Sequence, residues 1–267
     1  MKIAFIGDSY CAQPVFESAL SHYRPYQYLV AQEYSAKIIA IGRSSGCLFH
    51  SYEDLLDVVD EADYTIFCIT ALHRLVNRYK LGLNFSSVEQ YMITGIDTSW
   101  QAIADERHEQ FMDPMVATKW NDSFSFGQHI PKKLLDNIYN AADNYFEFLW
   151  YDEFGLYIHK CILRDIDQLM IEKKKKCIWF PCFENSMQKY VPKSGPITDT
   201  VLQKISDAEL KKLHRPVRAA FDTVDYRPNH FNFENNKNMA NLIIDIIKKD
   251  NFSPHEIKME DYFEVLK

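Results

Sequence analysis

Short apolar segments and helical patterns alternate at the start of the chain. Residues 2–6, 37–41 and 64–69 are apolar runs of strand length. Residues 14–34, and a stretch opened by the capping-box pattern of residues 51–54, read as helices between them. The order strand, helix, strand, helix, strand with short links predicts parallel strands joined by right-handed crossovers.

The second half of the chain adds a strand and several helices. Residues 176–180 are apolar and are followed by Pro181, which predicts a fourth strand. Apolar residues recur at helical spacing from 234 to 249, which predicts an amphipathic helix near the end of the chain. Further helices are expected at residues 131–144, 153–174 and 206–213.

These elements predict one domain over residues 1–267. Residues 75–130 have no regular pattern, and we interpret them as an insertion at an edge of the sheet. The expected architecture is a three-layer α/β/α sandwich whose mainly parallel sheet has about five strands. Residues beyond 251 are expected to be peripheral.

Charge and apolar content exclude several classes of function. The formal net charge is −7, whereas a nucleic-acid-binding protein would show a basic patch, so no nucleic-acid partner is expected. The one basic run, residues 173–176, is interpreted as a solvated helix end. There is no apolar run of about 18 residues and no signal-peptide pattern, which predicts a cytoplasmic protein without a membrane span.

The cysteines and histidines do not have the spacing of a disulfide framework or a metal site. The six cysteines form no C-x-x-C pair, and no histidines have a spacing such as H-x-x-x-H. The nucleotide-binding patterns G-x-G-x-x-G and the P-loop are also absent from the sequence. We therefore expect neither a metal nor another cofactor.

The turn after the first strand carries the strongest chemical signal. Ser9 follows Gly7 and Asp8 directly after that strand, and catalytic residues of open α/β sheets gather at the carboxyl ends of strands. Free backbone N–H groups of a following helix can stabilise negative charge there. A serine at this position can equally well be a helix cap, so position alone leaves both interpretations open.

The sequence Ile6-Gly7-Asp8-Ser9 in this setting resembles the first block of the SGNH/GDSL hydrolase family, which has a flavodoxin-like fold. The stretch from Arg43 to Gly46 is similar to the family's next block, and Arg227-Pro-Asn-His230 resembles its last. The resemblance implies that Ser9 is the nucleophile and His230 is the base. It also implies that the backbone N–H groups of Ser9 and Gly46 bind the oxyanion.

The residue types suit this chemistry. A serine hydroxyl becomes a good nucleophile only when a neighbouring base takes its proton. Histidine is the side chain whose unperturbed pKa is near neutrality. Backbone N–H groups aimed at the developing oxyanion contribute several kcal/mol in such reactions.

Two departures from the family pattern leave alternatives open. The family has Gly-x-Asn-Asp after the third strand, whereas this chain has Thr70 followed by His73 and Arg74. Any of these three could supply an oxyanion or substrate contact, or the segment could be an ordinary strand end.

The second departure concerns the acid. The family's aspartate lies three residues before the histidine, where this chain has Arg227, and Asp225 and Asp222 are the nearby acids. Asp225 could orient His230, the site could be a Ser-His dyad, or it could be degenerate. Arg227 could bind an anionic substrate group.

The expected function is that of a serine esterase that acts on a small acyl ester, with a carbohydrate O-acetyl group as the favoured substrate. Asp8, His73, Arg74 and Arg227 are the candidate substrate-binding residues. The alternative is an SGNH-like binding or structural protein without turnover. General resemblance to SGNH-like proteins of bacteriophages makes a phage-associated role one form of that alternative.

Overall fold

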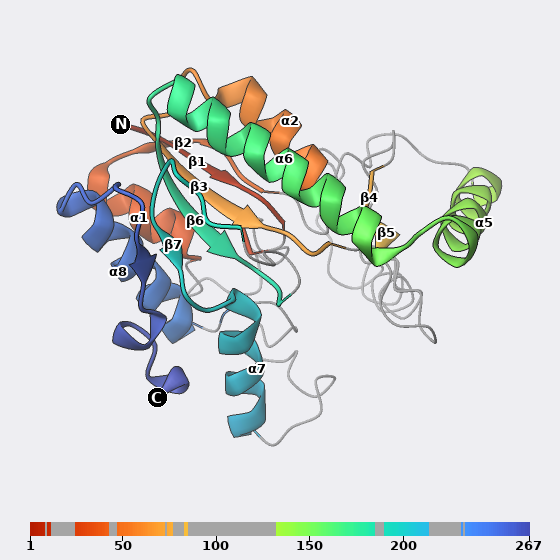
Figure 1. The fold of residues 1–267 in the computed structure, drawn as a ribbon. Coiled ribbons are helices and arrows are strands. Elements are labelled where there is room, and N and C mark those ends of the chain that lie inside the picture. Colours follow the sequence, from red (N-terminus) through yellow and green to blue (C-terminus); the bar gives the residue numbers. More distant parts are fainter. Residues whose placement is uncertain are drawn as a thin grey trace.

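A central sheet organises the computed structural model (Figure 1). The structure describes residues 1–8, 10–11, 25–42, 47–72, 74–76, 83–84, 132–184, 190–213, 231 and 233–267.

Six strands form this sheet in the order β2-β1-β3-β6-β7-β8, and each of its strand pairings is parallel. The strands are β1 (Lys2–Ile6), β2 (Lys37–Ala40), β3 (Tyr64–Ile69), β6 (Lys176–Pro181), β7 (Ile197–Thr198) and β8 (Glu256–Ile257). The four strands expected from the sequence are neighbours. The prediction of an α/β fold with a mainly parallel sheet is confirmed.

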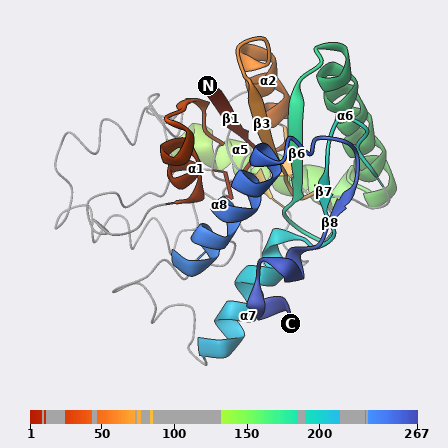
Figure 2. The same cartoon turned by 90° about the vertical axis from the view of Figure 1, so that its left-hand side faces the viewer.

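Helices cover both faces of the sheet (Figures 1 and 2). The first face carries α1 (Tyr26–Tyr34) and α8 (Phe233–Lys248), and the second carries α2 (Leu48–Val58) and α6 (Asp152–Glu172). Successive side chains of a strand point to opposite faces, so neighbouring residues enter different cores. Phe5 packs in the core with α1 and α8, whereas Ile6 packs in the core with α2 and α6. Burial of both faces explains why these strands read as continuous apolar runs.

The remaining elements lie around this sandwich. They are β4 (Arg74–Leu75), β5 (Leu83–Asn84), α5 (Lys132–Phe148), α7 (Leu202–Leu213), η2 (Met259–Asp261) and η3 (Glu264–Leu266). The predicted insertion at 75–130 lies mostly outside the described residues, and its described part includes the antiparallel pairing of β4 with β5. In the described part of the chain, no helix has both the length and the apolarity needed to span a membrane.

The second helix does not begin where the capping-box pattern predicted. It begins at Leu48, and Cys47 rather than Ser51 is its N-cap residue. The Ser51 hydroxyl donates to the carbonyl oxygen of Cys47 over 3.3 Å, a bond back to the preceding turn within the helix. The prediction was wrong because the residues before Ser51, including the apolar Leu48 and Phe49, are also helical, which moves the start of the helix back by about one turn.

The expectation that residues beyond 251 are peripheral was also wrong. Ile197 and Thr198 of β7 pair with Glu256 and Ile257, so this segment supplies the sixth strand. Met259 and Phe263 beyond it are fully buried in the core on the α1 and α8 face. A strand of two residues followed by short 3-10 helices has no hydrophobic periodicity, so the sequence pattern could not indicate that this segment is part of the sheet and the core.

The buried tail gives a first prediction. Phe263→Ala should lower the free energy of unfolding by about 3–5 kcal/mol, because the aromatic ring leaves a cavity in the core. Urea denaturation measures the loss. Phe49→Ala, which removes the same ring from an exposed position on α2, is the control and should have a much smaller effect. Equal losses in the two variants would show that the tail does not contribute to the core as described.

Candidate functional site

The turn that follows β1 depends on Gly7. Its φ angle is +145°, in a region that favours glycine, and a Cβ atom there would overlap the carbonyl group of Cys68 on β3. The chain can therefore leave β1 in close contact with β3. The turn continues with a hydrogen bond of 3.0 Å from the N–H of Cys11 to the carbonyl oxygen of Asp8.

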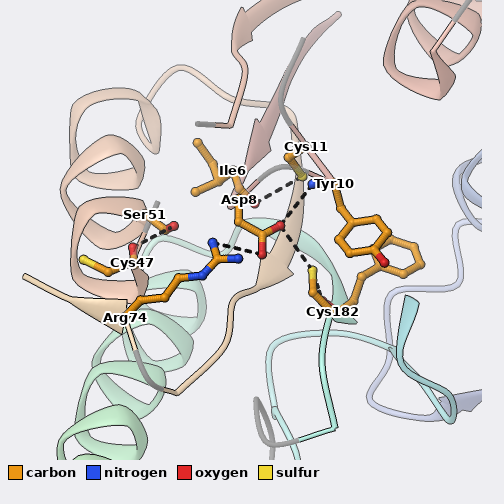
Figure 3. A network of polar contacts seen from close by, with 9 residues as sticks. Ile6, Asp8, Tyr10, Cys11, Cys47, Ser51, Arg74 and Cys182 are labelled. Atoms are coloured by element: carbon orange, nitrogen blue, oxygen red, sulfur yellow. Dashed lines mark hydrogen bonds and ion pairs between the residues drawn. The ribbon is translucent and has the colours of Figure 1, made fainter. Parts of the chain in front are cut away.

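The Asp8 side chain is buried beside this turn, with 0 % exposure. Its Oδ1 accepts hydrogen bonds from the Tyr10 N–H at 3.1 Å and from the Cys182 thiol at 3.5 Å. Its Oδ2 forms an ion pair with Nη1 of Arg74 at 3.4 Å. Figure 3 shows Arg74 and Cys182 approaching the carboxylate from different sides. The carboxylate thus brings together the segments that follow β1, β3 and β6.

Arg74 is nearly as deeply buried as its partner. Its side chain is 5 % exposed, and its guanidinium carbon lies 5.2 Å from the centre of the Phe183 ring. Removing two charges from water is costly, and their attraction and hydrogen bonds must offset that cost. The ion pair between Asp8 and Arg74 therefore fixes the path of the chain after β3.

The cysteines near Asp8 have the properties of buried structural thiols. Burial raises the pKa of Cys182 to about 12, so its thiol stays protonated and can donate to Asp8. Burial also raises the pKa values of Cys11 and Cys68 well above the ordinary value. The Tyr26 hydroxyl lies 3.4 Å from the sulfur of Cys11 and 3.8 Å from that of Cys68. A thiol must ionise to act as a nucleophile, so these three are poor candidates for that role.

Thr70 directly follows β3 and has a buried hydroxyl. Its side chain has 0 % exposure, and its Oγ1 has no hydrogen-bond partner in the part of the chain that the structure describes. A buried hydroxyl without a partner costs about 1–3 kcal/mol. Its hydroxyl is not committed to another acceptor among those residues, and its role as an oxyanion donor stays a prediction.

Aromatic packing connects the turn after β1 with the segment before α8. The rings of Tyr10 and Phe231 lie 5.3 Å apart, and the Tyr10 hydroxyl is 3.2 Å from that of Ser206. Asn236 of α8 supports this packing: its side-chain amide donates to the carbonyl oxygen of Phe231 at 3.0 Å, and its Oδ1 accepts from the Tyr26 N–H at 3.0 Å. In the sequence, Tyr10 follows Ser9 and Phe231 follows His230.

Three of the candidate site residues are described, and they have different positions. The structure brings Asp8 and Arg74 together, and it places Thr70 directly after the neighbouring strand β3. Asp8 is fully buried and holds Arg74 by the ion pair, and its contact with a substrate stays a prediction. Six other candidates lie outside the described residues: Ser9, Gly46, His73, Asp225, Arg227 and His230.

The sequence patterns missed several supporting residues. Cys182, Tyr10, Phe231 and Asn236 all contribute to the site, yet none belongs to a catalytic motif. Position is the only signal that could have found them, because each lies at the end of a predicted strand or helix. In the described part of the chain, no three His, Cys, Asp or Glu side chains are grouped as a metal ion would require.

Comparisons of the chain with models of protein families, with curated proteins and with solved structures gave no match.

The buried ion pair gives a second prediction. Asp8→Asn should destabilise the protein by about 3–5 kcal/mol, because it removes the negative charge that Asp8 places beside the buried Arg74 guanidinium. Arg74→Met should have a comparable effect, and the double variant should lose less than the sum of the two. Urea denaturation of the four proteins gives the coupling energy, expected at about 1–3 kcal/mol.

The exposed pair of Lys2 and Glu61 provides the matched control, since exposed pairs contribute little. Lys2→Met and Glu61→Gln should combine additively. Additive losses at Asp8 and Arg74 would contradict the view that their charges depend on each other.

Proposed function

We propose that this chain is a serine hydrolase of the SGNH type that acts on a small acyl ester, with Ser9 as nucleophile and His230 as base. The observation that supports it is the contact between Tyr10 and Phe231, whose rings lie 5.3 Å apart. Each of these residues is the immediate sequence neighbour of one proposed catalytic residue. A nucleophile and its base must come within hydrogen-bond reach, so packing between their neighbours is what the mechanism needs.

The proposed reaction has two steps. His230 takes the proton of Ser9 as its oxygen attacks the ester carbonyl, and the tetrahedral intermediate collapses to an acyl-enzyme as the alcohol leaves with that proton. Water then attacks the acyl-enzyme with His230 again as base, which releases the acid and restores Ser9. The N–H groups of Ser9 and Gly46 and the hydroxyl of Thr70 stabilise the oxyanion.

The Arg74 guanidinium has a supporting role in this proposal. It occupies the segment in which the SGNH family has an asparagine, and Asp8 holds it by the ion pair. A guanidinium has five N–H donors, so it can bind more than one acceptor. His73 and Arg227 remain proposed substrate contacts, and an O-acetyl group on a carbohydrate remains the favoured ester.

A second candidate function is binding without turnover on an SGNH-like fold. The deep burial of Arg74 and its pairing with Asp8 favour it, because a cation engaged in this way contributes less to an oxyanion than a free amide would. A phage-associated interaction role is one form of this candidate.

The third prediction separates the two candidates. A fluorophosphonate probe should label the protein at one serine, and Ser9→Ala should abolish both labelling and hydrolysis of p-nitrophenyl acetate. Ser253→Ala is the matched control. Ser253 is exposed and precedes β8, the edge strand at the other end of the sheet from β2 and β1. Folded protein that neither labels nor hydrolyses the ester would favour binding without turnover.

A fourth prediction concerns the group that orients His230. Asp225 lies two residues farther from His230 than the family spacing, which adds up to roughly 7 Å of chain. Pro228 restricts Arg227 to extended conformations, so a compact bulge is disfavoured. We therefore propose a dyad of Ser9 and His230, in which a backbone carbonyl or water fixes the imidazole tautomer.

Asp225→Asn should then reduce kcat only mildly, far less than the roughly 10⁴-fold loss on removal of a triad acid. Asp222→Asn serves as the control for loss of a nearby negative charge. A loss of triad size in Asp225→Asn alone, with unchanged thermal stability, would show that a full triad operates.

A further inference from the structure

The corner at which α5 meets α6 carries a group of exposed apolar side chains. Six large residues there are 40–69 % exposed: Phe148, Leu149, Tyr151, Phe154, Tyr157 and Ile158. A whole aromatic side chain has about 150–250 Å² of surface. At their exposed fractions, the six side chains together present roughly 600 Å² of largely apolar surface. This is at the upper end of what a monomer exposes in one patch, and it approaches the roughly 800 Å² that each partner buries in a stable interface.

The corner is built as a rigid unit. The Trp150 ring lies against Gly155 of α6, where a Cβ atom would overlap it. Its centre is 6.3 Å from that of Tyr145 and 5.7 Å from that of Phe146, both on α5. Its indole N–H donates to the carboxylate of Asp152 at 2.9 Å. A surface fixed in this way loses little conformational entropy when it binds a partner.

From this corner α6 runs across the sheet (Figure 1), and its exposed apolar side chains continue the surface along the helix. Phe154, Tyr157, Ile158 and the half-buried Cys161 follow the spacing of one helix face. The inner face packs against the sheet through residues that include Leu163, Ile166 and Met170.

Charged residues flank the outward face on one side. At 100° per residue, Glu153, Lys160 and Arg164 fall on the same flank, with the acid near the start of the helix and the bases about two and three turns later. None of the three has an ion pair within the described part of the chain. The flank thus has a negative end and a positive end without internal partners.

We propose that a second copy of this chain docks on this face, with the two α6 helices antiparallel about a two-fold axis between residues 157 and 158. In this arrangement Phe154 faces Cys161 of the second copy, and the Tyr157 and Ile158 side chains meet at the axis. Glu153 of each copy lies between Lys160 and Arg164 of the other. In a parallel two-fold arrangement the two charged flanks would lie on opposite sides of the interface, so these charges could not pair.

The pattern selects a second copy because it is self-complementary. A two-fold interface uses the same surface on both subunits, so each charge must find its opposite on that same surface. Apolar contacts at the axis supply affinity, and the flanking charges fix the orientation. The inference uses none of the residues of the proposed hydrolase site, so either can fail without the other.

The experiment is sedimentation equilibrium of the full chain over a concentration series. We expect a species of twice the 31.4 kDa of one chain. Tyr157→Glu, at an exposed position, should weaken the dimer about a hundredfold or more, because it places two carboxylates at the axis. Asn241→Glu adds the same charge at an exposed position on α8, which covers the opposite face of the sheet, and should leave the dimer unchanged. A wild-type protein that stays monomeric up to roughly 100 μM would overturn the proposal.

Charge reversal and cross-linking test the antiparallel geometry. Glu153→Lys should weaken the dimer about tenfold, and combination with Lys160→Glu and Arg164→Glu should restore it. In a Cys161→Ser background, Ile158→Cys lies near the axis and should form an intersubunit disulfide under mild oxidation, whereas Asn241→Cys on α8 should not. A dimer that tolerates Glu153→Lys, or one in which Ile158→Cys fails to cross-link, would overturn this arrangement.

Discussion

The Asp8 carboxylate has no contact with solvent, and a negative charge in that position is tolerated only while donors and a positive charge surround it. This requirement connects segments that are far apart in the sequence. Arg74, which follows β3, must lie where it can pair with Asp8. The thiol of Cys182, which follows β6, must stay protonated to donate to the same carboxylate. Because β1, β3 and β6 are adjacent in the sheet, the Asp8 side chain holds together the segments that follow these three central strands.

The central strands could be predicted because strands that are buried on both faces consist of continuous apolar runs. The pairing of Asp8 with Arg74 could not, since charge complementarity between distant residues leaves no local pattern. Asp8, Thr70 and Arg74 were nevertheless found as candidates, because they follow predicted strands and such ends form the functional edge of an α/β sheet. The tail beyond residue 251 was misjudged because its burial depends on β7, which contributes only two residues itself.

The turn after β1, where the hydrolase site is proposed, and the first turns of α6, where the dimer is proposed, lie toward the same edge of the sheet. Figure 1 shows that α6 runs against the direction of the strands, so its first turns lie toward their carboxyl ends. The turn after β1, which leads into Ser9 in the sequence, is at that same edge. A second copy bound on the outward face of α6 would therefore add its bulk near this edge without using the side chains around Asp8.

The position of β8 has a consequence for how the protein is made. A ribosome releases the chain from its N-terminal end, so β1, β2 and β3 can pair while synthesis continues. The two residues of β7 must wait for Glu256 and Ile257, and the core on the α1 face lacks Met259 and Phe263 until those residues have emerged. A nascent chain of this protein therefore exposes an open sheet edge and an unfilled core until residues 256–263 have left the ribosome.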